Sequence, residues 1–235
     1  MSVGSADFGS ADVTAPPDRF ERILRSAVGG DPAAVGVGGY GEARLVYTAP
    51  EFATSDDPAA ERRTVHLALD VWTEPEAPLH APRAGRVEFV HDNTARLDYG
   101  PVVILRHETD AGVPYFSLYG HLSVRTLDHV RVGDEVAAGE VFAWVGTAPR
   151  NGDWAPHVHV QVILDLLDLG VDYPGVARDS QASTWLGLSP DPALLLGLGD
   201  AAVPAARRPI EETLADRRRL LGRNLSVSYA QPLRI

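Results

Sequence analysis

Residues 156–162 read P-H-V-H-V-Q-V, and this stretch carries the clearest structural pattern in the chain. Its valines alternate with His157, His159 and Gln161, which is the period-two pattern of a β-strand with one buried face. We expect the valines in the core and the polar row on an open face. Two imidazoles side by side on a strand suit metal binding or proton transfer, although a polar sheet face that happens to carry histidines fits equally well.

The composition argues against several function classes. The 235 residues, 45% of them hydrophobic, suit one globular domain with flanking segments. A net charge of -11 argues against nucleic acid and anionic membranes as partners. Cysteine is absent and all 21 basic residues are arginine, which excludes thiolate metal sites, Schiff-base enzymes and lysine-linked carriers. No signal-peptide or membrane-spanning pattern is visible, so we expect a cytoplasmic location.

A second strand is predicted over residues 64–72, which read T-V-H-L-A-L-D-V-W. His66 and Asp70 share one face of this strand, together with Ala68 and Trp72. An imidazole and a carboxylate four residues apart converge on one ion only if the strand bends or their side chains lean together. The pair therefore adds to the case for a metal site without deciding it.

Short strands and turns fill the region from residue 77 to residue 145. Strands are predicted after Gly85, over 101–107, over 115–123 and within 130–145, and the third of these places Tyr119 and His121 on one face. Turn signals recurring about every eight to twelve residues indicate an antiparallel β domain, a sandwich or a barrel.

The remaining segments predict short flanking elements. In chain order, we expect a helix over 18–29, a flexible loop with a G-x-G-x-x-G pattern over 36–41, a strand-like run over 43–47, a helix over 163–169, irregular chain over 172–189, a helix beginning at Asp191 and Pro192, a linker over 198–209 and a helix over 211–221. The chain thus divides into an N-terminal tail with a short helix (1–35), a mainly β domain (36–189) and a helical and linker tail (190–235).

Taken together and in order, these motifs resemble the lysostaphin-type (LytM-like) zinc metallopeptidases. The family carries H-x-x-x-D, Y-x-H-L and H-x-H, which stand here at 66–70, 119–122 and 157–159. The A-P-x-x-G-x-V turn at 81–87 and the V-x-V-G-D-x-V-x-x-G hairpin at 130–139 match family landmarks as well. The resemblance implies an antiparallel β sandwich or barrel of the duplicated-hybrid-motif type.

The resemblance also implies roles for individual residues. By position, His66, Asp70 and His159 would ligate Zn²⁺ and leave a fourth position to water, while His121 and His157 would transfer protons beside the metal. The expected reaction is hydrolysis of a peptide bond by a metal-activated water.

Two positions depart from the family pattern. Ala68 stands where the family usually has glycine, and Gln161 stands where it usually has glutamate. Gln161 cannot carry a negative charge, so we expect it to stabilise His159 electrostatically less than a glutamate would. Both changes put catalytic competence in question.

Residues 216–235 look like the opening of a class III pyridoxal-phosphate aminotransferase, and residues 151–165 resemble the peptidase-like middle domain of long fusion proteins. That resemblance implies a kinase-like domain before this one and an aminotransferase after it. The alternative function is thus a catalytically weak or inactive metal-binding module with a structural or regulatory role. A third alternative is a non-haem iron site, since two histidines and one carboxylate describe it too.

The other histidines and two tryptophans are expected to have structural roles or to face solvent. His107 is expected to line the back of a groove or to bond locally, and Trp72 and Trp154 to wall the groove or pack in the core. Three more histidines, in turn-like segments, are expected to be solvated: His80, His91 and His129.

Overall fold

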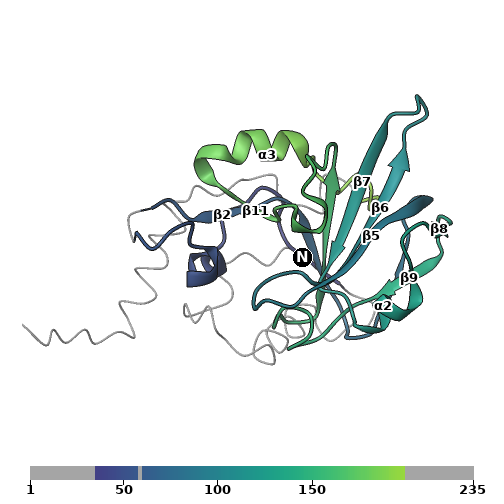
Figure 1. The fold of residues 1–235 in the computed structure, drawn as a ribbon, viewed down its shortest axis with the longest axis horizontal. Coiled ribbons are helices and arrows are strands. Elements are labelled where there is room, and N and C mark those ends of the chain that lie inside the picture. The colour runs from purple at the N-terminus through teal and green to yellow at the C-terminus, as the bar shows by residue number, and fades with distance from the viewer. Residues whose placement is uncertain (1–34, 58–59, 199–235) are drawn as a thin grey trace, which may run out of the picture.

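The computed structural model describes residues 35–57 and 60–198, which form a mainly β structure with few and short helices (Figure 1). Its main sheet has seven strands in the order β1-β3-β10-β7-β6-β5-β8, and every neighbouring pair is antiparallel. Two smaller antiparallel pairs, β11-β2 and β4-β9, complete the strands. The mainly antiparallel β fold expected from the sequence is confirmed. The helices expected over 18–29 and 211–221 and the aminotransferase-like tail lie outside the described residues.

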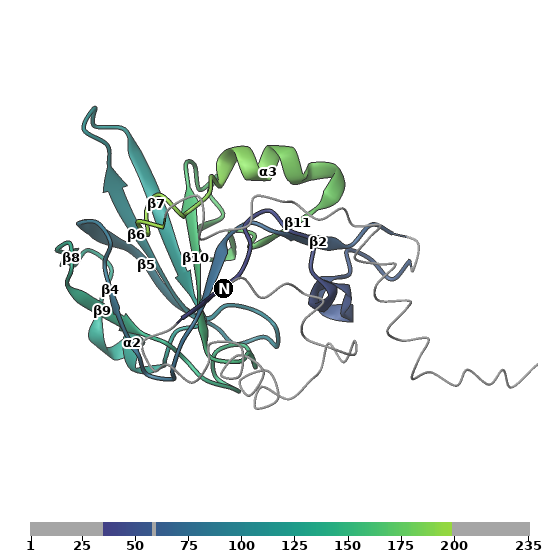
Figure 2. The same cartoon turned by 180° about the vertical axis from the view of Figure 1, so that it is seen from behind.

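The strand bounds are β1 Gly36–Val37, β2 Arg63–His66, β3 Leu69–Trp72, β4 Pro78–His80, β5 Gly85–Asn93, β6 Gly100–Glu108, β7 Pro114–Gly120, β8 Glu135–Val136, β9 Val141–Trp144, β10 His157–Ile163 and β11 Val176–Arg178. The helices are α2 Arg125–His129 and α3 Ala182–Leu188, with 3₁₀ turns η1 Leu45–Thr48, η2 Pro50–Phe52, η3 Gly170–Asp172 and η4 Asp179–Gln181. In both views α3 lies beside the β2–β11 pair (Figures 1 and 2).

Strand β10 lies within the main sheet and is buried on both faces. Val158 and Val160 pack in one apolar cluster with Tyr119 of β7. On the other face a second cluster forms around Leu118 and Ile163. The predicted strand is confirmed, but the open polar face is wrong, because every residue of β10 is buried. Its histidines therefore lie in an enclosed polar layer.

The expected helix over 163–169 is absent, for reasons visible in the backbone. Ile163 is still paired with Phe116 in the main sheet, and Leu167 and Asp168 have φ values of 49° and 59°. A right-handed helix requires negative φ, so these two residues turn the chain instead.

Four other local expectations also need correction. Residues 36–41 include β1, which pairs with β3, and 43–47 form a single bridge at Ala43 followed by η1 instead of a strand. Residues 172–189 contain β11 and α3 instead of irregular chain. Asp191 does cap the backbone N–H of Ala193, yet only turns follow it, over residues 192–197.

No helix in the described residues is long and apolar enough to cross a membrane.

Candidate metal centre

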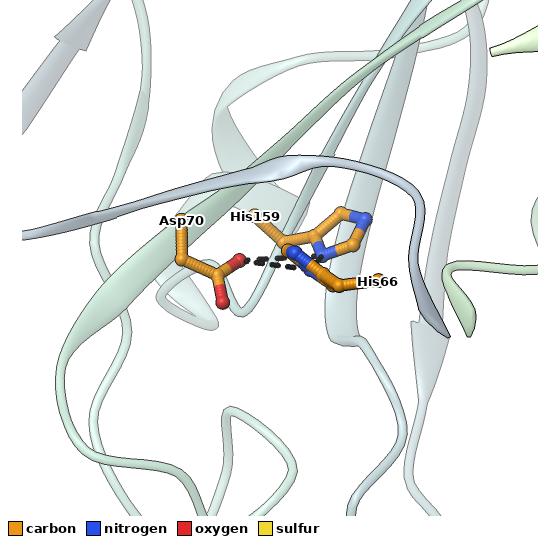
Figure 3. A group of neighbouring side chains, drawn as sticks. All are labelled: His66, Asp70 and His159. Carbon is orange, nitrogen blue, oxygen red and sulfur yellow. Dashed lines mark hydrogen bonds and ion pairs between the residues drawn. The ribbon is translucent and has the colours of Figure 1, made fainter. Parts of the chain in front are cut away.

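Three side chains from separate strands converge on one point (Figure 3). His66 ends β2, Asp70 lies in β3 and His159 lies in β10. The Nε2 atom of His66 is 3.1 Å from Nδ1 of His159, and both nitrogens are 3.4 Å from Oδ1 of Asp70. The structure therefore brings together the three residues predicted as metal ligands.

A break in the predicted strand produces this convergence. Residues 64–72 do not form one strand: β2 ends at His66, and β3 begins at Leu69. His66 pairs with Val176 of β11, whereas Asp70 pairs with His159 of β10. The chain changes sheets between the two residues, and this change supplies the bend that a shared ion needs. The single-strand prediction was wrong.

Ala68 fits this bend without strain. It lies between the two strands, fully buried, and it is not among the non-glycine residues with positive φ. Only a left-handed backbone here would have required glycine. The alanine is therefore compatible with the ligand geometry.

The donor atoms fit a bound cation. Oδ1 of Asp70 is buried and accepts no hydrogen bond from the described residues, although it faces imidazole nitrogens. A buried carboxylate oxygen that accepts no hydrogen bond costs folding free energy unless a bound cation compensates its charge. Two imidazole nitrogens and one carboxylate oxygen form a ligand set found in catalytic zinc sites.

Gln161 sets the proton position on His159. Its Nε2 donates to the carbonyl of Pro174 at 3.2 Å and to Oγ of Ser189 at 2.9 Å. Its Oε1 is consequently turned toward Nε2 of His159, 3.1 Å away, and accepts the proton there. Nδ1 of His159 is then unprotonated toward Asp70, as a metal ligand must be. Gln161 lacks the charge of a glutamate but keeps the orienting hydrogen bond.

Burial and nearby charge hold His66 and Asp70 in the protonation states that can bind a metal. Burial, and then the charge of Arg44, lowers the pKa of His66 to about 3, so its imidazole is neutral at pH 7. Burial alone would raise the pKa of Asp70, but the imidazole of His66 beside it and the positive charge of Arg44 hold it well below its usual range. A neutral imidazole and an ionised carboxylate are the forms that bind metal.

The two predicted proton-transfer residues lie side by side next to this group. The rings of His121 and His157 are 4.5 Å apart, and Nε2 of His157 is 3.8 Å from Oδ1 of Asp70. Nδ1 of His121 lies 3.0 Å from the carbonyl of Asn151, and Nδ1 of His157 lies 2.7 Å from that of Ala155. A carbonyl only accepts, so each Nδ1 carries the proton and each Nε2 has a free lone pair.

His121 reaches this position through a left-handed backbone. β7 ends at Gly120, and His121 has a φ of 62°. Regular strand alternation would have sent His121 after Tyr119 into the core on the valine side of β10. The positive φ turns its ring to the opposite face, where it contacts His157 and Tyr99. The prediction that Tyr119 and His121 share a face was wrong, and the left-handed backbone nevertheless places the His121 ring beside His157.

Aromatic rings enclose the histidines. Trp72 stacks on His157 with centroids 5.5 Å apart, and Trp154 lies 5.6 Å from His121. Tyr99 packs 5.2 Å from His159 in space left by Gly120, where a Cβ would lie 2.6 Å from the tyrosine ring. The expectation was that the two tryptophans wall the groove or pack in the core; both lie against site histidines, and Trp72 is also buried.

Arg44 is the site residue that sequence reasoning missed. It is buried, and its Nη1 donates to Oδ2 of Asp70. The only signal was a charged residue within the otherwise apolar run 43–47, which by itself indicates nothing about a site.

The remaining histidines lie apart from this group. His107 is buried and hydrogen bonds the carbonyl of Ala84 and Oγ of Ser117, which confirms local bonding. The other three are exposed as expected, although they lie on β4, β5 and α2 instead of in turns: His80, His91 and His129.

Comparisons with known proteins give one family match and several similar solved structures. Residues 64–167 match the sequence model of peptidase family M23. Among solved structures, the catalytic domain of the antimicrobial peptidase lysostaphin from Staphylococcus simulans is 20% identical, with a TM-score of 0.40 over 68% of this chain and 89% of that one. The catalytic domain of the prophage-encoded M23 protein EnpA from Enterococcus faecalis is 22% identical, with a TM-score of 0.37 over 53% and 85%.

A zinc-containing peptidase from Vibrio cholerae is 25% identical, with a TM-score of 0.35 over 46% of this chain and 30% of that one. A comparison with curated proteins finds no match. The matched range 64–167 includes all five histidine and aspartate side chains of the site. The resemblance drawn from the motifs is confirmed, and residues 64–167 of this chain form a domain of peptidase family M23.

Proposed function

We propose that this domain is a zinc-dependent endopeptidase of the lysostaphin type, with His66, Asp70 and His159 as the metal ligands. The observation that supports the proposal most is the position of Oδ1 of Asp70, which lies 3.4 Å from two imidazole nitrogens and has no hydrogen-bond donor among the described residues. Family membership supports a peptidase, and the donor set supports zinc.

Bound zinc would supply a Lewis acid and a water with a pKa lowered toward ~7. His157 and His121 present unprotonated Nε2 atoms beside the ligands. Either atom is suited to accept a proton from the attacking water and to return it to the leaving amine. Protonated histidine at this position would also stabilise negative charge on the tetrahedral intermediate. The aromatic walls formed by Trp72 and Trp154 limit water around these groups and strengthen their electrostatics.

The burial of the site favours a second candidate, a metal-binding module with little or no turnover. None of the five proposed ligand and proton-transfer residues is more than 6% exposed, and a peptide substrate must reach them. In that case the metal would stabilise the fold or regulate neighbouring domains. We propose the fused kinase-like and aminotransferase domains as those neighbours, in a cytoplasmic protein.

Metal analysis together with a peptidase assay separates these candidates. The purified protein should contain one zinc per chain, and the same elemental analysis tests the iron alternative. Zinc-loaded protein should cleave glycine-rich peptides, and H157A should not. H91A is the matched control, because His91 is exposed on β5. Zinc binding without any cleavage would favour the second candidate, and absence of zinc binding would overturn both.

A further inference from the structure

Arg44 lies directly behind the metal ligand Asp70 and is held there by several partners. Its Nη1 donates to Oδ2 of Asp70, its Nε donates to Glu42 at 2.8 Å, and its Nη2 donates to the carbonyl of Gly39 at 3.2 Å. Nη1 also lies 3.4 Å from the hydroxyl of Tyr47. A planar guanidinium with acceptors on all three nitrogens has one orientation available to it.

Packing confines the guanidinium further. Its carbon lies 5.9 Å from the centres of both the Tyr47 and Trp72 rings. Gly38 makes this space: a Cβ there would lie 2.5 Å from the Trp72 ring and 2.8 Å from Nη2 of Arg44. Arg44 is only 8% exposed. It therefore cannot swing into solvent without breaking four contacts at once.

The two oxygens of Asp70 consequently face different partners. Oδ2 accepts from Arg44, while Oδ1 faces nitrogens of His66 and His159 at 3.4 Å and of His157 at 3.8 Å. An aspartate that is free to rotate can offer a metal either one oxygen or two. Here the second oxygen is already engaged by Arg44, while the contacts to the histidines are all made by the first.

We propose that Arg44 is a positioning residue that restricts Asp70 to binding the metal through one oxygen. The inference rests on the proposed zinc site. With Oδ2 held by Arg44, the protein contributes three donor atoms: Nε2 of His66, Oδ1 of Asp70 and Nδ1 of His159. A fourth position then stays open for water, as a hydrolytic zinc site needs. Without Arg44, Oδ2 is free to turn toward the metal and raise the coordination number.

The test compares the coordination of the metal in the wild type, R44M and R44K, each loaded with one equivalent of Co²⁺ or Zn²⁺. Methionine keeps an apolar stem but cannot donate, whereas lysine keeps a cation near Oδ2. R106M is the matched control, because Arg106 is exposed and pairs only with Glu108 among the described side chains. Visible absorption of Co²⁺ reports coordination geometry, and X-ray absorption of Zn²⁺ reports the number of ligands.

In the wild type, R44K and R106M, we expect four-coordinate metal with one carboxylate oxygen. In R44M, we expect five-coordinate metal and about a twofold fall in Co²⁺ absorption per bound ion. An R44M spectrum identical to the wild type at equal loading would overturn the role of Arg44 and leave the metal site intact. Two carboxylate oxygens on the wild-type metal would also overturn it, even if R44M fails to fold. A wild type that binds neither ion would overturn the proposed function, and this inference with it.

Discussion

Asp70 and His159 are direct cross-strand partners in the β3–β10 pair, and Oδ1 of Asp70 lies 3.4 Å from Nδ1 of His159. Neighbouring strands hold opposed side chains about 4.5 to 5.5 Å apart at their Cβ atoms, so this pairing places two of the proposed metal ligands together through the backbone alone. Only His66 must then be added, and it comes from the β2–β11 pair. The site is thus formed where two sheets meet.

Replacing Asp70 by asparagine should abolish metal binding and destabilise the metal-free fold. D70N keeps the shape but leaves the buried Arg44 without its carboxylate partner, and breaking a buried ion pair costs about 3 to 5 kcal/mol. Denaturant unfolding of the metal-free protein measures this loss. D92N is the control, because Asp92 pairs with Arg150, whose side chain is 59% exposed. This substitution should lower the free energy of unfolding by less than about 1 kcal/mol. Equal losses in the two variants would contradict the account.

Gln161 should contribute to metal affinity although it binds no metal. Q161L removes the acceptor that keeps the proton of His159 on Nε2, and loss of such a partner typically weakens metal binding about 10- to 100-fold. Competition with a chromophoric chelator measures the change. Q181L, at an exposed glutamine, should bind the metal as the wild type does. An unchanged affinity in Q161L would mean that the hydrogen bond does not orient His159.

Substitution of His121 should reduce peptide cleavage without reducing metal binding. H121A and H121G should both retain the full metal content, because His121 lies outside the proposed ligand set, and both should lose about 10²- to 10⁴-fold in peptide cleavage. H121G should nevertheless be more stable than H121A by about 1 kcal/mol, because the φ of 62° is strained for alanine and not for glycine. Thermal unfolding of the two variants tests this order, and a more stable H121A would contradict it.

The metal-free protein should begin to lose stability as the pH falls below about 6.5, the ordinary pKa of histidine. The pKa of His66 falls from its ordinary 6.5 to about 3, and burial lowers the pKa of His121 and His157 too. Below pH 6.5 the unfolded chain therefore binds protons that the folded chain does not. Stability is then present above pH 6.5 and is lost as the pH falls toward 3, by up to about 1.4 kcal/mol per pH unit for each histidine.

Unfolding temperatures of the metal-free protein at pH 7, 6 and 5 measure this dependence. H91Q should leave the dependence unchanged, since His91 is exposed. An unfolding temperature that stays constant between pH 7 and pH 5 would show that these histidines are protonated in the fold.

The sequence predicted the site residues better than the local backbone around them. Alternation in 156–162 identified β10, and motif order grouped His66, Asp70 and His159, because side-chain type and spacing are local properties. The break between His66 and Leu69 depends on pairing with β11 and β10, which follow about a hundred residues later in the chain. No local pattern contains that information.

The same reason applies to Arg44 and His121. Arg44 contributes through a contact with Asp70, 26 residues away, whereas an arginine in a short apolar run is in most proteins a surface residue. His121 required a backbone reversal directly after a regular strand, at a position occupied by neither glycine nor asparagine. The enclosure of the β10 histidines likewise depends on segments that pack over them, such as Tyr99 and Trp72.

The most direct test of the proposed metal site is a crystal structure of the zinc-soaked protein with diffraction data collected on both sides of the zinc absorption edge. We predict one anomalous peak, within bonding distance of Nε2 of His66, Oδ1 of Asp70 and Nδ1 of His159. A fully soaked crystal with no peak there, or with zinc held by other side chains, would contradict it.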